Sequence, residues 1–170
     1  MENDAGLVAL VERARGGDPA AWESLYRRAY PRLLAYARRR LAPDDAAKDA
    51  VAETMARAVR GMPSYRGEGA GFDAWLAGIV RHVVLDAQRR RARKPASSLP
   101  AAWDASDGRD GAEDQLVREE EAGAVRAAFE RLPEGDRELL ELRVVLGLSA
   151  EEVADVLGKR AGAVRMAQAR

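Results

Sequence analysis

The sequence contains no cysteine and a single histidine. Without cysteine there are no disulfide bridges and no thiolate metal sites, and one imidazole is too few for a histidine-based metal centre. We therefore expect neither a metal nor a cofactor. The sequence also lacks a serine–histidine–aspartate arrangement, a phosphate-binding glycine loop and a dinucleotide-binding fingerprint, so we do not expect an enzyme.

Long apolar runs are also missing, although 47% of the 170 residues are hydrophobic. The amino-terminal segment MENDAGLVALVERARGG has neither the apolar stretch of a signal peptide nor the length of a membrane span. We expect a protein without membrane insertion that works in the cytoplasm. A chain of this length holds one ordinary domain or two small helical ones.

The formal net charge is zero, but the charges are unevenly distributed. Residues 1–94 carry 18 basic and 12 acidic side chains, residues 95–114 carry one basic and five acidic, and residues 115–170 carry nine and eleven. One basic cluster surrounds Arg90, and a second lies at the C-terminus. Because phosphate contact depends on local potential, both clusters are candidate nucleic-acid contacts, and the alternative for each is a solvated helix face.

Apolar residues recur at steps of three and four, which predicts helices throughout the chain. Asp18 and Pro19 are a typical helix start, and a second helix is expected over residues 44–60. A glycine-rich loop over residues 65–72 precedes a third helix. The apolar stripe of that helix comprises Trp75, Leu76, Ile79, Val80, Val83 and Val84. No strand alternation is visible, so the predicted fold class is all-α.

Residues 95–114 lose this periodicity and are rich in Pro, Ser, Ala, Gly and Asp. Such a composition is typical of an exposed, flexible linker. Helical spacing resumes over residues 115–132 and again over residues 134–146. The predicted organisation is therefore two small helical domains, residues 1–94 and 115–170, joined by an acidic linker over residues 95–114.

The last 22 residues contain the most specific local pattern. Ser149 and Glu152 form a capping box, and Gly158 stands where a helix would end in a left-handed residue. Ala154, Gly158 and Val164 have the spacing of a helix-turn-helix, and an ordinary helical hairpin is the alternative. The second helix would present Arg and Gln side chains, which read base edges by paired hydrogen bonds. The candidate DNA contacts here are Lys159, Arg160, Arg165, Gln168 and Arg170.

Several motifs in order resemble a sigma-70 family RNA polymerase sigma factor of the extracytoplasmic-function group. The segment LVERARGGDPAAWESLYRRAYPRLLAYARRRL is similar to the opening of sigma region 2. The segment DAAKDAVAETMARAVRGMPSYRGEGAGFDAWLAGIVRHVVLDAQRRRARKP is similar to the remainder of region 2, with Phe72, Trp75 and Leu76 matching the F-x-x-W-L run of the family. The segment LPEGDRELLELRVVLGLSAEEVADVLGKRAGAVRMAQAR is similar to region 4, with its G-x-V-R run at residues 162–165. The resemblance covers nearly all of the chain except the linker.

The resemblance implies promoter-directed initiation with core RNA polymerase, through its β′ and β subunits, and with promoter DNA as partners. Region 2 would dock on the polymerase and recognise the −10 element, and region 4 would recognise the −35 element. The implied polymerase-binding residues are Asp45, Asp49, Glu53 and Arg57. The implied −10 contacts, which capture a flipped base or bind phosphates, are Arg66, Phe72, Arg81, His82, Asp86, Arg89, Arg90 and Arg91.

Three positions depart from the family pattern. Ala52 stands where the family often has Gln in the polymerase-docking helix, which puts that contact in doubt. His82 replaces a frequent Asn near the flipped-base pocket, so it either alters the −10 base preference or packs against its own helix. The sequence given stops at Arg170, inside the expected −35 recognition helix.

The resemblance also implies an anti-sigma factor that covers the polymerase- and DNA-binding surfaces. Two other functions compete with the sigma interpretation. One is a stand-alone helix-turn-helix regulator that binds duplex DNA as a dimer. The other is a sigma mimic that acts only through protein–protein interaction.

Overall fold

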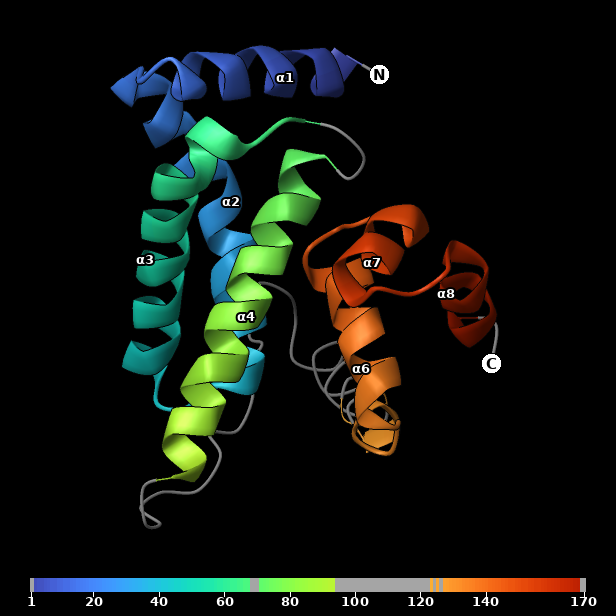
Figure 1. Cartoon of the computed structure of the whole chain (residues 1–170). Helices are drawn as coiled ribbons and strands as arrows, with labels where there is room; N and C mark the ends of the chain where they lie inside the picture. Colours follow the sequence, from blue (N-terminus) through green and yellow to red (C-terminus); the bar gives the residue numbers. More distant parts are fainter. Residues whose placement is uncertain (1, 68–70, 94–122, 124, 126, 169–170) are drawn as a thin grey trace, which may run out of the picture.

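The computed structural model describes residues 2–67, 71–93, 123, 125 and 127–168. Within these residues every regular element is helical, as predicted (Figure 1). The predicted linker over residues 95–114 lies outside the described residues, as do Lys94 and Arg170. The two boundaries between the three predicted segments therefore stay predictions.

The amino-terminal unit consists of four helices and one short turn of 3₁₀ helix. These elements are α1 (Glu2–Arg15), α2 (Pro19–Arg40), α3 (Asp44–Gly61), η1 (Met62–Ser64) and α4 (Phe72–Ala92). Helices α2, α3 and α4 pack side by side, and α1 lies across one end of them (Figure 1). The Asp18 side chain accepts hydrogen bonds from the backbone nitrogens of Ala20 and Ala21, so the predicted start of α2 is confirmed.

The core of this unit comes from the apolar stripes that the spacing predicts. Leu25 and Tyr36 of α2, Val51 of α3, and Leu76 and Val80 of α4 are all 2% exposed or less. Burial of such side chains on facing helices is the main favourable contribution to the packing of a small helical domain. Helix α1 has no counterpart among the predicted helices, although its apolar residues Leu7, Leu10, Val11 and Ala14 have helical spacing and pack on the core beside α2.

The carboxy-terminal unit contains α6 (Glu134–Leu140), a π-helical turn η2 (Glu141–Val145), α7 (Ala150–Leu157) and α8 (Ala161–Gln168). The single helix predicted over residues 134–146 is thus an α-helix that widens into a π turn after Leu140. Helices α6 and α7 lie beside α4, and α8 lies on the outer side of α7 (Figure 1). The buried residues of both units belong to one hydrophobic cluster.

Candidate nucleic-acid and partner interface

The exposed face of α3 carries the four side chains predicted to contact the polymerase. Asp45 and Asp49 are exposed near the amino-terminal end of the helix, whereas Glu53 and Arg57 are half-buried one and two turns further on. Arg57 Nε donates to Glu53 Oε1 at 2.7 Å, and this hydrogen bond lowers the pKa of the Glu53 carboxyl. Ala52 is exposed on the same helix. The structure therefore places all four residues on the surface, where a partner can reach them.

The stem of the glycine-rich loop is built on an aromatic cluster of Tyr65, Phe72 and Trp75. The ring centroids of Tyr65 and Trp75 are 4.9 Å apart, and those of Phe72 and Trp75 are 5.7 Å apart. A Cβ atom on Gly61 would lie only 3.2 Å from the Trp75 ring, so the helix end approaches that ring closely. Arg66 of the loop is exposed, and residues 68–70 lie outside the described part of the chain.

Phe72 does not point toward solvent as a direct DNA contact would require. Its side chain is 3% exposed and packs in the core at the first position of α4. Aromatic pairs of this kind contribute about 0.5–1.5 kcal/mol beyond the burial of their area. Phe72 in this conformation supports the loop, and its contact with a flipped base stays a prediction.

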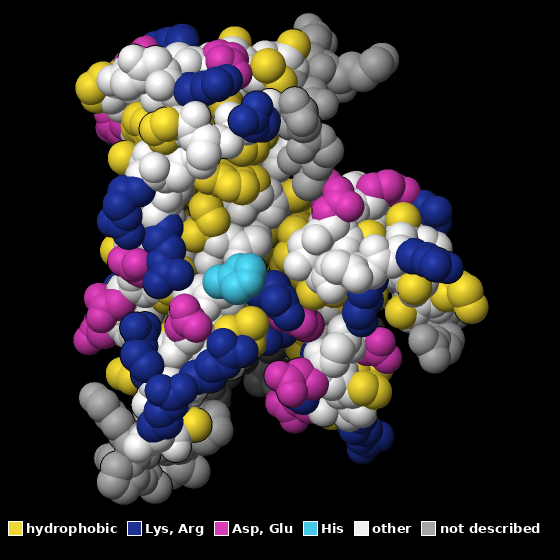
Figure 2. Space-filling model, viewed as in Figure 1, with side chains coloured by type: hydrophobic (Ala, Val, Ile, Leu, Met, Phe, Trp, Pro, Cys, Tyr) yellow, Lys and Arg dark blue, Asp and Glu magenta, His cyan; other side chains and the backbone are white. Residues whose placement is uncertain are grey.

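The remaining candidate −10 residues lie along α4. His82 is exposed, and its Nδ1 is 2.7 Å from the carbonyl oxygen of Gly78, so the ring packs against its own helix. Asp86 lies between Arg57, at 3.8 Å, and Arg89, at 3.6 Å. Arg89 and Arg90 are exposed. Figure 2 shows basic side chains gathered on the part of this face where the last turns of α4 lie.

Arg91 and Arg81 are not simple solvated arginines. The Arg91 guanidinium donates to the carbonyl oxygen of Ala42, so part of the arginine cluster ties α4 to the segment after α2. Arg81 is half-buried, with Nε 2.8 Å from Glu138 Oε1 and Nη2 3.3 Å from Oε2 of the same carboxylate. Arg81 therefore contacts the other unit of the protein.

Helices α7 and α8 form the predicted helix-turn-helix. Ser149 and Glu152 make both hydrogen bonds of the capping box, and Gly158 ends α7 with φ 63° in the left-handed region. Ala154 and Val164 are buried between the two helices, at 3% and 0% exposed. These features confirm the turn geometry that the sequence predicts.

Helix α8 presents its polar residues outward. The candidate −35 residues that are exposed are Lys159, Arg160, Arg165 and Gln168. The Arg165 guanidinium is hydrogen-bonded to the Glu151 carboxylate of α7, although both side chains are more than half exposed. A backbone hydrogen bond and this contact lower the pKa of Glu151. Exposed pairs of this type are weak, so a phosphate or base can displace Glu151.

The two units meet at a cluster of four charged side chains that the sequence reasoning missed. Arg40 Nε of α2 is 2.6 Å from Glu141 Oε2, and its Nη1 is 4.0 Å from Glu138 Oε1. Arg81 binds the same Glu138. The side chains of Arg40, Glu141 and Glu138 are only 8%, 6% and 13% exposed. The one sequence signal is that Glu138 and Glu141 interrupt the apolar stripe of residues 134–146.

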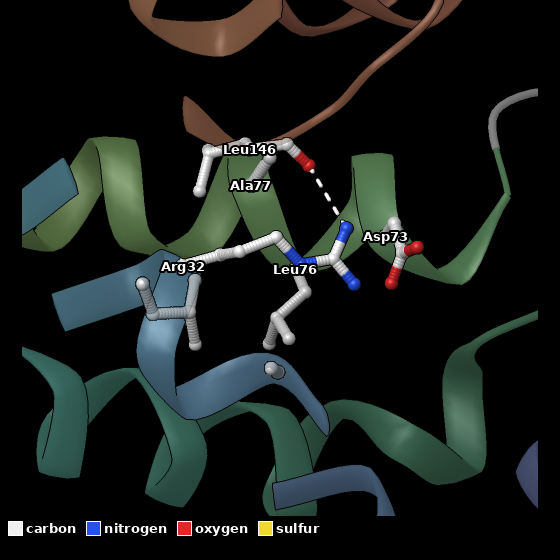
Figure 3. A pocket seen from close by; sticks show the side chains of 7 residues that line it. Arg32, Asp73, Leu76, Ala77 and Leu146 are labelled. Carbon is white, nitrogen blue, oxygen red and sulfur yellow. Dashed lines mark hydrogen bonds between the residues drawn. The ribbon is translucent and has the colours of Figure 1, made fainter. Parts of the chain in front are cut away.

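A small pocket lies between α2, α4 and the segment after η2 (Figure 3). Arg32 Nη1 donates to the carbonyl oxygen of Leu146 at 3.2 Å across it. Leu76, Ala77 and Leu146 line its apolar side. The boundary between the units thus combines apolar contact with ion pairs.

No helix among the described residues is long and apolar enough to cross a membrane. In the same part of the chain, His, Asp and Glu side chains form no group suited to hold a metal ion.

Comparison with known proteins gives two family models in chain order. The model described as Sigma-70 region 2 matches residues 25–94, and the model described as Sigma-70, region 4 matches residues 122–170. The chain is 36% identical to the ECF RNA polymerase sigma factor ShbA of Streptomyces griseus, over 100% of this chain and 94% of that protein. It is also 36% identical to the ECF RNA polymerase sigma factor SigD of Mycobacterium tuberculosis, over 96% of this chain and 79% of that protein.

Among solved structures, the fold is similar to that of CnrH in complex with the cytosolic domain of CnrY. The TM-score is 0.67 at 25% sequence identity, over 95% of this chain and 89% of CnrH. Both units of the chain are therefore included in the structural match.

Proposed function

The chain belongs to the extracytoplasmic-function group of sigma-70 family RNA polymerase sigma factors, and we propose which of its surfaces bind core polymerase and which bind promoter DNA. The outer face of α3 binds core polymerase, α4 and the loop before it engage the −10 element, and α8 engages the −35 element. A protein of this family is a transcription initiation factor and not an enzyme. It works in the cytoplasm, where the polymerase and promoters are found.

The observation that carries this division is the separation of the candidate residues onto different faces. Exposed carboxylates lie on α3, exposed arginines lie on the last turns of α4, and exposed basic residues lie on α8 and in the turn before it. Basic surfaces supply the phosphate contacts that give affinity, and Arg and Gln side chains on a helix-turn-helix read base edges. The acidic face suits a basic protein partner instead, because it would repel DNA.

The relatives and the two-unit match favour the sigma function over the two alternatives. A stand-alone helix-turn-helix regulator needs only α7 and α8 and gives no reason for a region 2 unit. A sigma mimic would keep the fold without promoter binding. The exposed −35 candidates Lys159, Arg160 and Arg165 favour DNA binding by this chain and therefore count against the sigma mimic.

Co-elution with bacterial core RNA polymerase on a sizing column tests the α3 surface. The test variant is Asp49→Arg with Glu53→Arg. The matched control is Glu12→Arg with Glu23→Arg, which reverses the same number of carboxylates at side chains that are 62% and 61% exposed on other helices. We expect stoichiometric co-elution of the parent and the control and its loss in the test variant. If the parent protein does not co-elute with the polymerase, polymerase binding is contradicted and a DNA-binding regulator is favoured instead.

The same family assignment supports control by an anti-sigma factor. CnrH, whose fold the chain shares, was solved with the cytosolic domain of CnrY bound. Such a partner here would cover the α3 face or the α4 and α8 surfaces. Inhibition of promoter-dependent transcription by a co-encoded protein that also co-purifies with the chain is the expected result, and a co-encoded protein without either effect counts against this form of control.

A further inference from the structure

We propose that Arg57 is a positioning residue and not a contact of the polymerase. It holds one carboxylate on each of two binding surfaces, Glu53 on α3 and Asp86 on α4. By balancing the charge of Asp86, it makes the outer side of α4 more favourable to DNA without touching a phosphate. The inference deepens the proposed function and rests on it, since it requires that α4 faces promoter DNA.

Helices α3 and α4 pack side by side (Figure 1), and Arg57 lies at the boundary between them. Its Nε donates to Glu53 Oε1 at 2.7 Å, one turn earlier on α3. Its Nη1 is 3.8 Å from Asp86 Oδ2, so the second contact crosses from α3 to α4. Each carboxylate is engaged by a different nitrogen of the guanidinium, so the two contacts coexist and Arg57 bridges the helices.

Glu53 is held by internal partners in this arrangement. Besides the contact with Arg57, its Oε1 is 3.6 Å from Arg60 Nη2. The hydrogen bond from Arg57 lowers the pKa of Glu53 most, and the charges of Arg57, Arg60 and Arg90 lower it further. Arg90 belongs to α4, so its effect on Glu53 also crosses the helix boundary. Glu53 is therefore ionised at neutral pH, with Arg57 as its closest cation.

The surroundings of Arg57 are unfavourable to a direct contact with polymerase. Its side chain is 37% exposed, compared with 66% for Arg60. A guanidinium that already binds two carboxylates must release at least one of them before it binds a third group. The exposed carboxylates Asp45 and Asp49 on the same helix suit a basic partner, which an arginine would repel.

Asp86 is the residue through which Arg57 affects DNA. It is half-buried on α4 beside the exposed Arg89, whose Nη1 is 3.6 Å from Asp86 Oδ1. On this face, acidic side chains lie among the basic ones (Figure 2). An unbalanced carboxylate here would repel phosphates and would hold the Arg89 guanidinium away from them. Arg57 neutralises this carboxylate from the side of α3, so that Arg89 can bind the phosphate backbone.

A double-mutant cycle between Arg57 and Asp86 tests the inference. Fluorescence anisotropy would measure binding of the full chain to a fluorescein-labelled duplex of random sequence at low salt. Such a probe contains no promoter element, so base reading by Asp86 does not enter the result. The proteins compared are the parent, Arg57→Gln, Asp86→Asn and the double variant. Arg27→Gln is the matched control, because it removes the arginine of another Glu–Arg pair with the same i, i+4 spacing, on α2.

We expect Arg57→Gln to weaken DNA binding about three- to fivefold in the parent, and by less than about twofold when Asp86 is already Asn. The reason is that Arg57 acts by balancing the Asp86 charge. A variant with a damaged fold would not be rescued by Asp86→Asn, so the cycle also separates positioning from misfolding. Arg27→Gln should change the affinity by less than about twofold. Equal losses in the two backgrounds, or no loss in either, would overturn the inference, because they would show a direct contact or no role.

Polymerase binding gives a second readout for the same variant. Arg57→Gln should co-elute with core polymerase as the parent does, under conditions in which Asp49→Arg with Glu53→Arg fails. Loss of co-elution by Arg57→Gln would make Arg57 a polymerase contact and would also overturn the inference.

Arg89→Gln separates the inference from the proposed function. This variant should weaken binding to the duplex and lower the slope of log affinity against log salt by about one. If Arg89→Gln has no effect, α4 does not face DNA, and both the proposed −10 surface and the inference fail. If Arg89→Gln weakens binding but the loss at Arg57 is the same with Asp86 and with Asn at position 86, only the inference fails.

Discussion

Arg28 and Asp73 form a two-point ion pair that ties α2 to the first turn of α4. Arg28 Nη1 is 2.5 Å from Asp73 Oδ1, and Nη2 is 2.8 Å from Oδ2. Both side chains are less than one third exposed. Charge-assisted, bidentate pairs are stronger than single hydrogen bonds between neutral groups. This pair therefore helps to fix where α4 begins and, with it, the position of the preceding loop.

Replacement of Asp73 by Ala should lower the free energy of unfolding by about 1–3 kcal/mol, because the half-buried Arg28 loses a charged hydrogen-bond partner. Urea unfolding followed by circular dichroism measures the change. Glu23→Ala is the control, since its pair with Arg27 is exposed and should contribute only about 0.5 kcal/mol or less. Equal losses in the two variants would contradict the structural role of the Arg28–Asp73 pair.

Gly158 ends α7 at φ 63°, a conformation that disfavours any side chain with a Cβ. Gly158→Ala should therefore destabilise the helix-turn-helix by about 1–2 kcal/mol, although no atom lies within 4 Å of the added Cβ. Gly162→Ala is the matched control, because that Cβ also meets open space and Gly162 lies inside α8. It should be neutral or stabilise by up to about 1 kcal/mol. If the denaturant midpoints of both variants shift in the same direction, the result contradicts the role of the left-handed conformation at Gly158.

Because of Tyr36, we expect the free energy of unfolding to depend on pH in the alkaline range. Burial of its ring and the carboxylates Glu138 and Glu141, opposed by Arg40, raise the pKa of Tyr36 from 10.0 to about 12. The folded state keeps the proton more tightly than the unfolded state. The corresponding stability is therefore complete below pH 10 and is lost as the pH rises through about 12, by roughly 2–3 kcal/mol.

Tyr36→Phe tests this dependence. The hydroxyl is buried and has no hydrogen-bond partner among the described residues, so its removal should cost little or stabilise the protein slightly at neutral pH. The ring that lies 5.3 Å below the Arg40 guanidinium is kept. Unfolding curves between about pH 9 and 12 should show a shallower loss of stability in the variant than in the parent. Parallel curves would contradict the assigned pKa.

DNA binding by α8 should separate base reading from phosphate contact. Arg165→Ala should weaken binding to a −35 duplex by about 1–3 kcal/mol and relax sequence preference. Lys159→Ala should weaken binding to all sequences alike and reduce the salt slope by about one. Titrations at several salt concentrations measure both effects. Met166→Ala, which removes an exposed side chain from the same helix, is the uncharged control.

Local features of the fold were predictable, because they depend on residues close in sequence. The Asp18 cap, the Ser149–Glu152 capping box and the left-handed Gly158 each follow from short-range backbone chemistry. The apolar stripes likewise identified most of the core. The π-helical turn η2 after α6 could not be predicted, because helical spacing alone does not distinguish a π turn from a continued α-helix.

The contacts between the units could not be predicted in this way. Arg81 and Glu138 are 57 residues apart in sequence, and either is by itself a normal solvated side chain. Phe72 matched a family motif, but only its position against Tyr65 and Trp75 shows that it is buried. Residues of a binding surface and residues of an internal boundary have the same chemical types, so the sequence alone does not separate them.

Promoter-directed initiation is the central claim, and mapping of transcript ends tests it most directly. Core polymerase reconstituted with this chain would transcribe genomic fragments of the source organism, and the 5′ ends would be sequenced. We expect starts that follow a shared pair of sequence elements, are absent with core polymerase alone, and are lost with the Asp49→Arg, Glu53→Arg variant. Starts identical to those of core polymerase alone would contradict the assignment of this chain as a working sigma factor.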